Sequence, residues 1–167
     1  MRDFGQPYRD EHLTRVAFPL GGIGAGMLCL EGSGTLSHLS LRHRPEILSE
    51  PLAFAAVCLK GEGSNLARVL EGPVPVHKPL VPWHRVVVMS SGSGAPGRTY
   101  GLPRLRQAEF EARFPFAQVR LRDPELPLAV EITGWSPFIP GHADDSSLPA
   151  TLMSYTVKND GSKPLDV

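Results

Sequence analysis

The sequence predicts an all-β protein, built as a sandwich of two antiparallel sheets. Seventeen glycines and seventeen prolines are spread along the 167 residues, so most uninterrupted pieces are too short for a helix. The pieces between them are rich in β-branched and aromatic residues, which favour strands. Short polar turns separate several of these pieces, and strands joined by short turns are normally antiparallel.

Six segments are predicted as strands. They are residues 53–59, 85–89, 109–114, 117–121, 128–135 and 152–159. In 109–114, Phe110, Ala112 and Phe114 are expected on one face and the charged residues between them on the other. The even-numbered residues of 128–132 are apolar in the same way and are expected to face the core.

The remaining segments are predicted as turns and loops. The longest helical candidate, 45–59, contains Pro51, which would remove an internal hydrogen bond, and it is therefore discounted. Turn residues occupy 122–127 and 159–161, the second as a hairpin turn, and the Ser/Gly-rich segment 90–98 is expected to be a surface loop.

The domain organisation is expected to be simple. Residues 1–15 form a charged N-terminal extension, and residues 16–167 form the sandwich domain. The last residues, 162–167, look like the start of another strand that the chain does not complete. We therefore expect a sandwich that is incomplete at its C-terminal end and has an unpaired sheet edge.

Composition excludes several classes of function. Seventeen basic and seventeen acidic residues cancel, which argues against a nucleic-acid partner. The longest uncharged apolar run, 51–59, is far shorter than the roughly 20 residues of a membrane-spanning helix. The charged N-terminus lacks the apolar centre of a signal peptide, so a cytoplasmic location is expected. Cys29 and Cys58 lack metal or disulfide spacing and are expected to be small buried residues.

The glycine-rich stretch PLGGIGAGMLCL, residues 19–30, does not fit a phosphate-binding loop. A dinucleotide-binding loop that starts at Gly22 and Gly24 requires glycine where Met27 stands, and no Lys-Ser or Lys-Thr follows. The favoured interpretation is a bend whose missing side chains let another backbone approach closely. The six histidines form no HExxH motif and no serine lies in a GxSxG elbow, so we predict no metal, no cofactor and no catalytic residue.

The segment 135–150, WSPFIPGHADDSSLPA, admits two interpretations. It would be a sugar or partner platform if Trp135 stacks on a ligand and Asp144 or Asp145 accepts hydroxyl hydrogen bonds. The favoured interpretation is structural: prolines fix the loop, Trp135 and Phe138 plug the end of the sandwich, and Asp144 or Ser146 caps a turn.

Four segments resemble one family, in order. They are PLGGIGAG (19–26), ARVLEGP (67–73), FPFAQVRLRDPELPLAVEI (114–132) and SPFIPGHADDSSLPA (136–150). The chain resembles the N-terminal β-sandwich domain of glycoside hydrolase family 116, which includes the non-lysosomal glucosylceramidase (bile acid β-glucosidase) and bacterial β-glucosidases. In that family an (α/α)6 barrel after the sandwich supplies the nucleophile and the acid/base carboxylate of a retaining mechanism.

The resemblance implies that this chain is a non-catalytic part of a β-glucosidase- or glucosylceramidase-type hydrolase. It assigns no catalytic or substrate-binding residue here, and a retaining enzyme needs two carboxyl groups about 5 Å apart. Glu109 and Glu111 are expected to face solvent beside Arg113, and Asp144 and Asp145 are neighbours in a loop. Neither set is therefore a credible catalytic pair.

The expected partner is the barrel, in the same or a separate chain, and a β-glucoside is contacted only through it. Peripheral membrane association of the parent enzyme is compatible with this interpretation. Contact with the barrel is expected at two loops, through Gly21, Gly22, Gly24, Trp135, Asp144, Asp145 and Ser146. Two alternatives stay open: a stand-alone carbohydrate-binding module, and a sandwich that binds a separately encoded partner.

Overall fold

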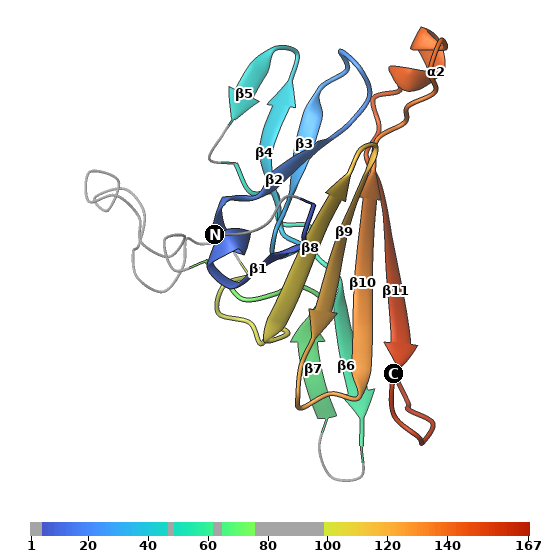
Figure 1. Ribbon diagram of the computed structural model, residues 1–167. Coiled ribbons are helices and arrows are strands. Elements are labelled where there is room, and N and C mark those ends of the chain that lie inside the picture. Colours follow the sequence, from blue (N-terminus) through green and yellow to red (C-terminus); the bar gives the residue numbers. More distant parts are fainter. Residues whose placement is uncertain (1–4, 47–48, 62–64, 76–98) are drawn as a thin grey trace, which may run out of the picture.

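The computed structural model describes residues 5–46, 49–61, 65–75 and 99–167, and it is built of antiparallel sheets (Figure 1). One sheet has the strand order β1-β8-β9-β10-β11, a second has β2-β3-β4-β5, and a third pairs β6 with β7. The all-β prediction is thereby confirmed. The strands are β1 (Tyr8–Arg9), β2 (Ala17–Leu20), β3 (Met27–Glu31), β4 (Leu36–Leu41), β5 (Arg44–Glu46), β6 (Ala56–Lys60), β7 (Asn65–Val69), β8 (Gln107–Arg113), β9 (Phe116–Arg122), β10 (Leu128–Trp135) and β11 (Leu152–Asn159).

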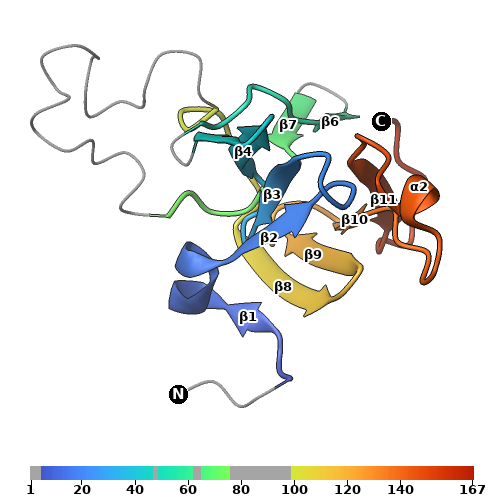
Figure 2. The same cartoon turned by 90° about the horizontal axis from the view of Figure 1, so that it is seen from above.

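The sheets form two layers, of which the second is divided. The five-stranded sheet is one layer, and the sheets β2–β5 and β6–β7 lie against its inner face (Figure 2). Only two short helices accompany them among the described residues, the 3-10 helix η1 (Asp10–Arg15) and α2 (Ala143–Ser146). The predicted two-sheet sandwich is thus a two-layer structure with three sheets.

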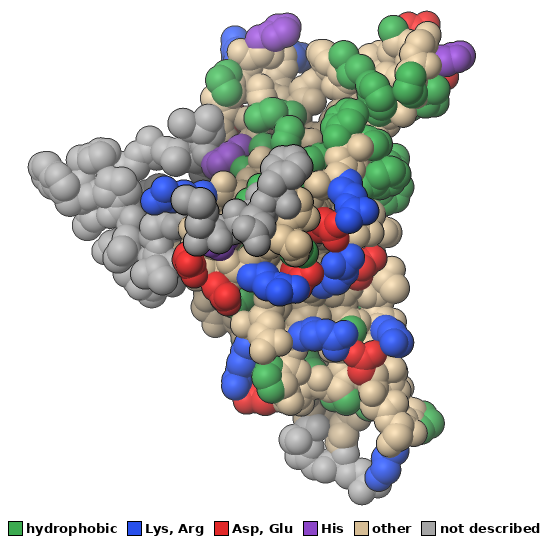
Figure 3. Space-filling view, viewed as in Figure 1, with side chains coloured by type: hydrophobic (Ala, Val, Ile, Leu, Met, Phe, Trp, Pro, Cys, Tyr) green, Lys and Arg blue, Asp and Glu red, His purple; other side chains and the backbone are tan. Residues whose placement is uncertain are grey.

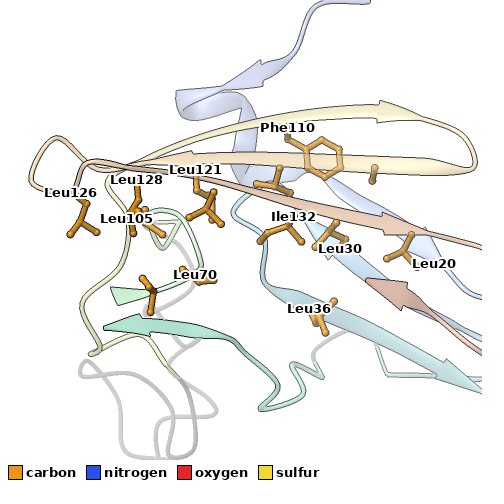
Figure 4. Close-up of a cluster of buried hydrophobic side chains, with 14 residues drawn as sticks. Leu20, Leu30, Leu36, Leu70, Leu105, Phe110, Leu121, Leu126, Leu128 and Ile132 are labelled. Atoms are coloured by element: carbon orange, nitrogen blue, oxygen red, sulfur yellow. The ribbon is translucent and has the colours of Figure 1, made fainter. Parts of the chain in front are cut away.

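The core lies between these layers (Figure 4). Leu20 and Leu30 from β2 and β3 are fully buried against Ile132 and Phe110 of the large sheet. Gly134 makes room for the second layer, since a Cβ there would lie 2.7 Å from Leu20 Cδ1. Burying apolar surface at roughly 25 cal/mol per Å² is what holds the layers together.

The strands β8, β9 and β10 form a meander with the predicted turns. Leu126 N–H donates to the Asp123 carbonyl at 3.0 Å, which closes the predicted turn at 122–127. In β10 the even-numbered residues are all buried, as the alternation predicts. In 109–114 only Phe110 is buried. Ala112 is exposed near the end of β8. Phe114 is 64% exposed because β8 ends at Arg113 and Phe114 lies in the following turn.

The other predicted elements have mixed outcomes. The strands predicted at 117–121, 128–135 and 152–159 correspond to β9, β10 and β11, and 53–59 forms a strand from Ala56 onward. No helix occupies the described part of 45–59. The predicted strand 85–89 and loop 90–98 lie outside the described residues. Cys29 is buried, and burial raises the pKa of its thiol, whereas the prediction for Cys58 is wrong because its β6 side chain points to solvent.

The end of the chain departs from a simple hairpin. Gly161 N–H donates to Asn159 Oδ1 at 2.8 Å, so a turn forms at the predicted place. The residues after it do not return along β11. Instead, Asp166 forms an antiparallel bridge with Lys60 in the other layer. The hairpin prediction is therefore wrong, and no described strand pairs with the outer edge of β11.

A buried ion pair joins the second layer to the segment before β8. Glu71 is 3% exposed and accepts hydrogen bonds from Arg104 Nη1 and, at 3.2 Å, from Thr99 Oγ1. Its backbone carbonyl accepts a hydrogen bond from Leu105 N–H at 3.1 Å. Burial raises the pKa of the Glu71 carboxyl, while the Arg104 charge and the Thr99 hydrogen bond act in the opposite direction.

This pair generates a prediction about stability. Glu71→Leu leaves the Arg104 guanidinium buried without its counter-charge, and we expect the free energy of unfolding to fall by about 3–5 kcal/mol. The double variant Glu71→Leu/Arg104→Met replaces the pair with apolar groups and should recover most of that loss. Urea denaturation measures both, and equal losses in the single and double variants would refute the argument.

Candidate interdomain surface

Two loops that are far apart in the sequence meet at one end of the sandwich. The β2–β3 loop, residues 21–26, lies against the connection between β10 and β11, residues 136–151. Ile23 N–H donates to the Ser146 carbonyl at 2.8 Å, and Gly21 N–H donates to Ser136 Oγ at 3.1 Å. Thr151 Oγ1 donates to the Leu20 carbonyl at 3.3 Å. The two predicted contact loops are therefore one structural unit.

Gly22 is the position where these loops come closest. It is buried, and a Cβ built on it would lie 2.1 Å from the Leu148 carbonyl oxygen and 2.7 Å from the Ser147 carbonyl carbon. Both atoms belong to backbone, so neither can move aside alone. The interpretation of the glycine-rich stretch as a bend that admits another backbone is confirmed.

Two further glycines of the same loop differ from Gly22. Gly21 has φ +144°, and a Cβ there would lie 2.4 Å from the Gly26 carbonyl oxygen, so it is also constrained. Gly24 has φ +72° and open space around it, so its conformation, not crowding, favours glycine. It is exposed at the tip of the loop.

Ser146 closes the longer loop. Its side chain is buried, and Oγ accepts a hydrogen bond from Ile139 N–H at 2.9 Å and donates one to the Ile139 carbonyl at 3.0 Å. Ser146 thus caps this loop with its side chain, but not through its own local backbone as predicted, because the hydroxyl bonds to the backbone of a residue seven positions earlier. Asp144 takes part through its carbonyl, which accepts hydrogen bonds from Ser147 N–H and Oγ at 3.2 and 3.0 Å.

Asp144 and Asp145 are exposed residues of α2. As direct neighbours on a helix they point in different directions and do not form a facing carboxyl pair. Across the parts of the chain that the structure describes, no group of three or more His, Cys, Asp or Glu side chains has a metal-binding arrangement.

Trp135 does not plug the sandwich, which corrects the structural interpretation of this residue. Gly134 before it belongs to the buried face of β10, so Trp135 lies half-buried on the opposite, outer face, between Phe116 of β9 and Leu152 of β11. Phe138 is 39% exposed and packs edge-on against Phe114, with ring centroids 5.0 Å apart.

Exposed apolar side chains collect around these loops, a feature that sequence reasoning missed. Figure 3 shows apolar side chains gathered over the loops and strand ends near α2. The exposed members with large side chains are Ile23, Phe114, Phe116, Phe138, Ile139, Leu148 and Leu152. We call this set, with the two loops, the loop-end surface. Apolar patches of this kind mark interaction sites.

The outer face of the five-stranded sheet has a different character. Arg120 lies at 3.3 Å from carboxylate oxygens of Glu109, Glu111 and Glu131, which come from the two flanking strands. Figure 3 shows the resulting band of alternating basic and acidic side chains. Glu109 and Glu111 therefore share one cation.

A groove of about 580 Å³ borders this charged band beside η1. Its lining includes Arg9, Arg106 and Arg122. Each of these side chains is already paired with a carboxylate: Arg9 with Glu109, Arg106 with Glu125, and Arg122 with Asp160. Hydrogen bonds from Arg122 and Lys158 lower the pKa of the Asp160 carboxyl. The groove thus offers little uncompensated charge to an anionic ligand.

The Gly22 contact predicts a strong effect of one methyl group. In Gly22→Ala the new Cβ overlaps backbone, so we expect the free energy of unfolding to fall by at least about 2 kcal/mol, in the range of overpacked sites. Gly101→Ala is the matched control, because a Cβ there meets nothing within 4 Å. Urea denaturation of both variants tests this, and a Gly22→Ala protein as stable as the control would contradict the contact.

Comparison with known proteins places the chain in a family. Residues 17–167 match the family described as beta-glucosidase 2, glycosyl-hydrolase family 116 N-term, and no curated protein matches the chain. Among the residues that the structure describes, no helix has the length and apolar character to cross a bilayer. The matched region holds the whole loop-end surface and every described strand except β1. The chain therefore belongs to the N-terminal domain family of glycosyl hydrolase family 116.

Proposed function

We propose that this chain is a non-catalytic β-sandwich part of a retaining β-glucosidase- or glucosylceramidase-type hydrolase. In this proposal residues 16–167 are the sandwich domain and residues 1–15 an N-terminal extension. The loop-end surface docks an (α/α)6 catalytic barrel, in the same or a separate chain, and the β-glucoside is bound by that barrel. We also propose a cytoplasmic location.

The observation that carries the docking proposal is the apolar character of the loop-end surface. Phe114 is 64% exposed, Ile23 is 60% exposed and Leu148 is 51% exposed, yet all three lie on loops that are fixed by hydrogen bonds or close backbone contact. A partner that covers such side chains gains their burial without paying much ordering entropy. Asp144 and Asp145 supply an exposed polar margin to the same surface, and Gly24 is exposed beside it.

The acidic residues support a role outside the chemistry. A retaining glycosidase holds two carboxyl groups about 5 Å apart across the scissile bond. The candidate acids here are either bound to Arg120, as Glu109 and Glu111 are, or are exposed neighbours on α2, as Asp144 and Asp145 are. Catalysis is accordingly assigned to the barrel.

The first expectation concerns activity of the isolated chain. The 167-residue protein should not hydrolyse an aryl β-glucoside above the rate of a buffer blank. Release of the aryl group, measured by absorbance, is the assay, and a folded state is checked by circular dichroism. Turnover that depends on protein concentration and survives repurification would defeat the proposal that the catalytic groups lie elsewhere.

The second expectation concerns docking. The variant Phe114→Ser/Phe138→Ser removes the aromatic pair from the loop-end surface, and we expect it to weaken binding to a family 116 catalytic barrel, supplied as a separate chain, at least about tenfold. Phe54→Ser is the control, since Phe54 is 44% exposed but lies outside the loop-end surface. Co-purification and calorimetry measure the binding.

Two outcomes would redirect this assignment. Equal binding by the double variant and the control would show that the loop-end surface is not part of the interface with the barrel. Calorimetric heat with gluco-oligosaccharides that disappears in Trp135→Ala would instead favour a carbohydrate-binding module, because the half-buried indole on the outer face is a group on which a sugar ring can stack.

A further inference from the structure

The core face of β11 is covered at Met153 but left partly open at Tyr155 and Val157. The antiparallel register places Val157 opposite Val130 and Tyr155 opposite Ile132, so these side chains share one face of the sheet. Val130 and Ile132 are buried under the second layer, whereas Tyr155 is 38% exposed and Val157 is 42% exposed. The second layer therefore ends before it reaches β11.

The strand of the second layer nearest this gap has an open edge. Lys60 N–H donates to the Asp166 carbonyl at 2.9 Å, away from the partner strand β7. Because hydrogen-bonding directions alternate along a strand, Cys58 and Ala56 present their backbone groups to the same side as Lys60. No described residue outside β7 forms a backbone hydrogen bond with either of them.

The last residues already occupy the entrance to this gap. Asp166 bridges Lys60 in antiparallel orientation, its carboxylate lies 3.3 Å from Lys60 Nζ, and Leu165 packs against the core. Leu165 and Val167 are apolar on either side of the polar Asp166, which is the alternation of a strand with one buried face. Figures 1 and 2 both show the C-terminus beside β6 and β11.

We propose that the open edge of β6, beside the exposed Tyr155 and Val157 of β11, accepts one more strand, which is antiparallel to β6 and continuous with Val167; we call this position the groove. Its backbone pairs with Cys58 and Ala56, and its apolar side chains cover Tyr155 and Val157. The phase follows from Leu165: in a strand added after Val167, the second and fourth positions would face the core, where apolar side chains fit, and the first and third would face solvent. The inference is independent of the proposed function, since it uses none of the loop-end surface.

Two extensions of identical composition test the groove. Thr-Val-Thr-Val-Thr-Val-Lys added after Val167 puts valine on the core side, and Val-Thr-Val-Thr-Val-Thr-Lys puts it on the solvent side. The first should raise the urea midpoint and slow amide exchange of Cys58 and Ala56 about tenfold or more. The second should do neither. Equal effects of the two extensions, or no effect of the first, would overturn the proposal.

A substitution of Val157, on the face of β11 that the added strand would cover, separates specific packing from a general effect of the extension on stability. Val157→Thr should be nearly neutral in the 167-residue chain, where Val157 is 42% exposed, and clearly destabilising in the chain with the first extension. The same cost in both chains would show that Val157 is not covered. A last experiment adds the first extension as a free peptide to the 167-residue chain. If it slows amide exchange of Cys58 as much as the fused extension does, the proposal that the strand must be continuous with Val167 is wrong.

Discussion

Burial of one face of β10 is the constraint on which the whole structure depends. Leu128, Val130 and Ile132 are the centre of the large sheet's inner face, and both sheets of the second layer pack on that face. Gly134 continues the same face without a side chain, and Leu20 and Leu30 fill the space. The position of β2 is thereby fixed by the end of β10, and the loops that follow these two strands are brought to the same end of the molecule.

The loop-end surface follows from that arrangement. Once β2 and β10 end side by side, the loop after one must pass the loop after the other, and Gly22 permits the backbones to touch. Ser146 then fixes the longer loop to its own beginning through Ile139. Such a surface is rigid before any partner arrives, which is the property that allows exposed apolar groups to contribute to affinity. The family membership and this geometry are both compatible with the proposed role as a scaffold beside a catalytic domain.

The sequence predicted the meander well and the second layer poorly. The period of two in β10 and the turn at 122–127 are local signals, and both elements were found where they were expected. The strands β2 and β5 contain Pro19 and Pro45, which are unfavourable in strands and masked the strand signal, and their pairing is set by tertiary contacts that no local pattern records.

For the site, the sequence correctly indicated a glycine bend that admits another backbone. The backbone that it admits lies more than 100 residues away, and a local pattern does not identify it. The alternation that places Ile132 inside also places Trp135 outside, because the two residues are an odd number of positions apart on β10. Phe114 has the side chain of a core residue, and its exposure follows from the end of β8 at Arg113, a boundary that the local pattern does not give. Phe116 is exposed because it lies on the outer face of β9.

The charged band around Arg120 determines the directions in which this domain can associate. Three carboxylates from neighbouring strands converge on one guanidinium, so a partner that covered this broad face would have to strip water from a network that is already satisfied. Stacking of sheets through the face is disfavoured for the same reason. Association is thereby disfavoured over the charged part of this broad face, and the apolar strand ends beside the loops are left as the part of the face that a partner can cover at lower cost.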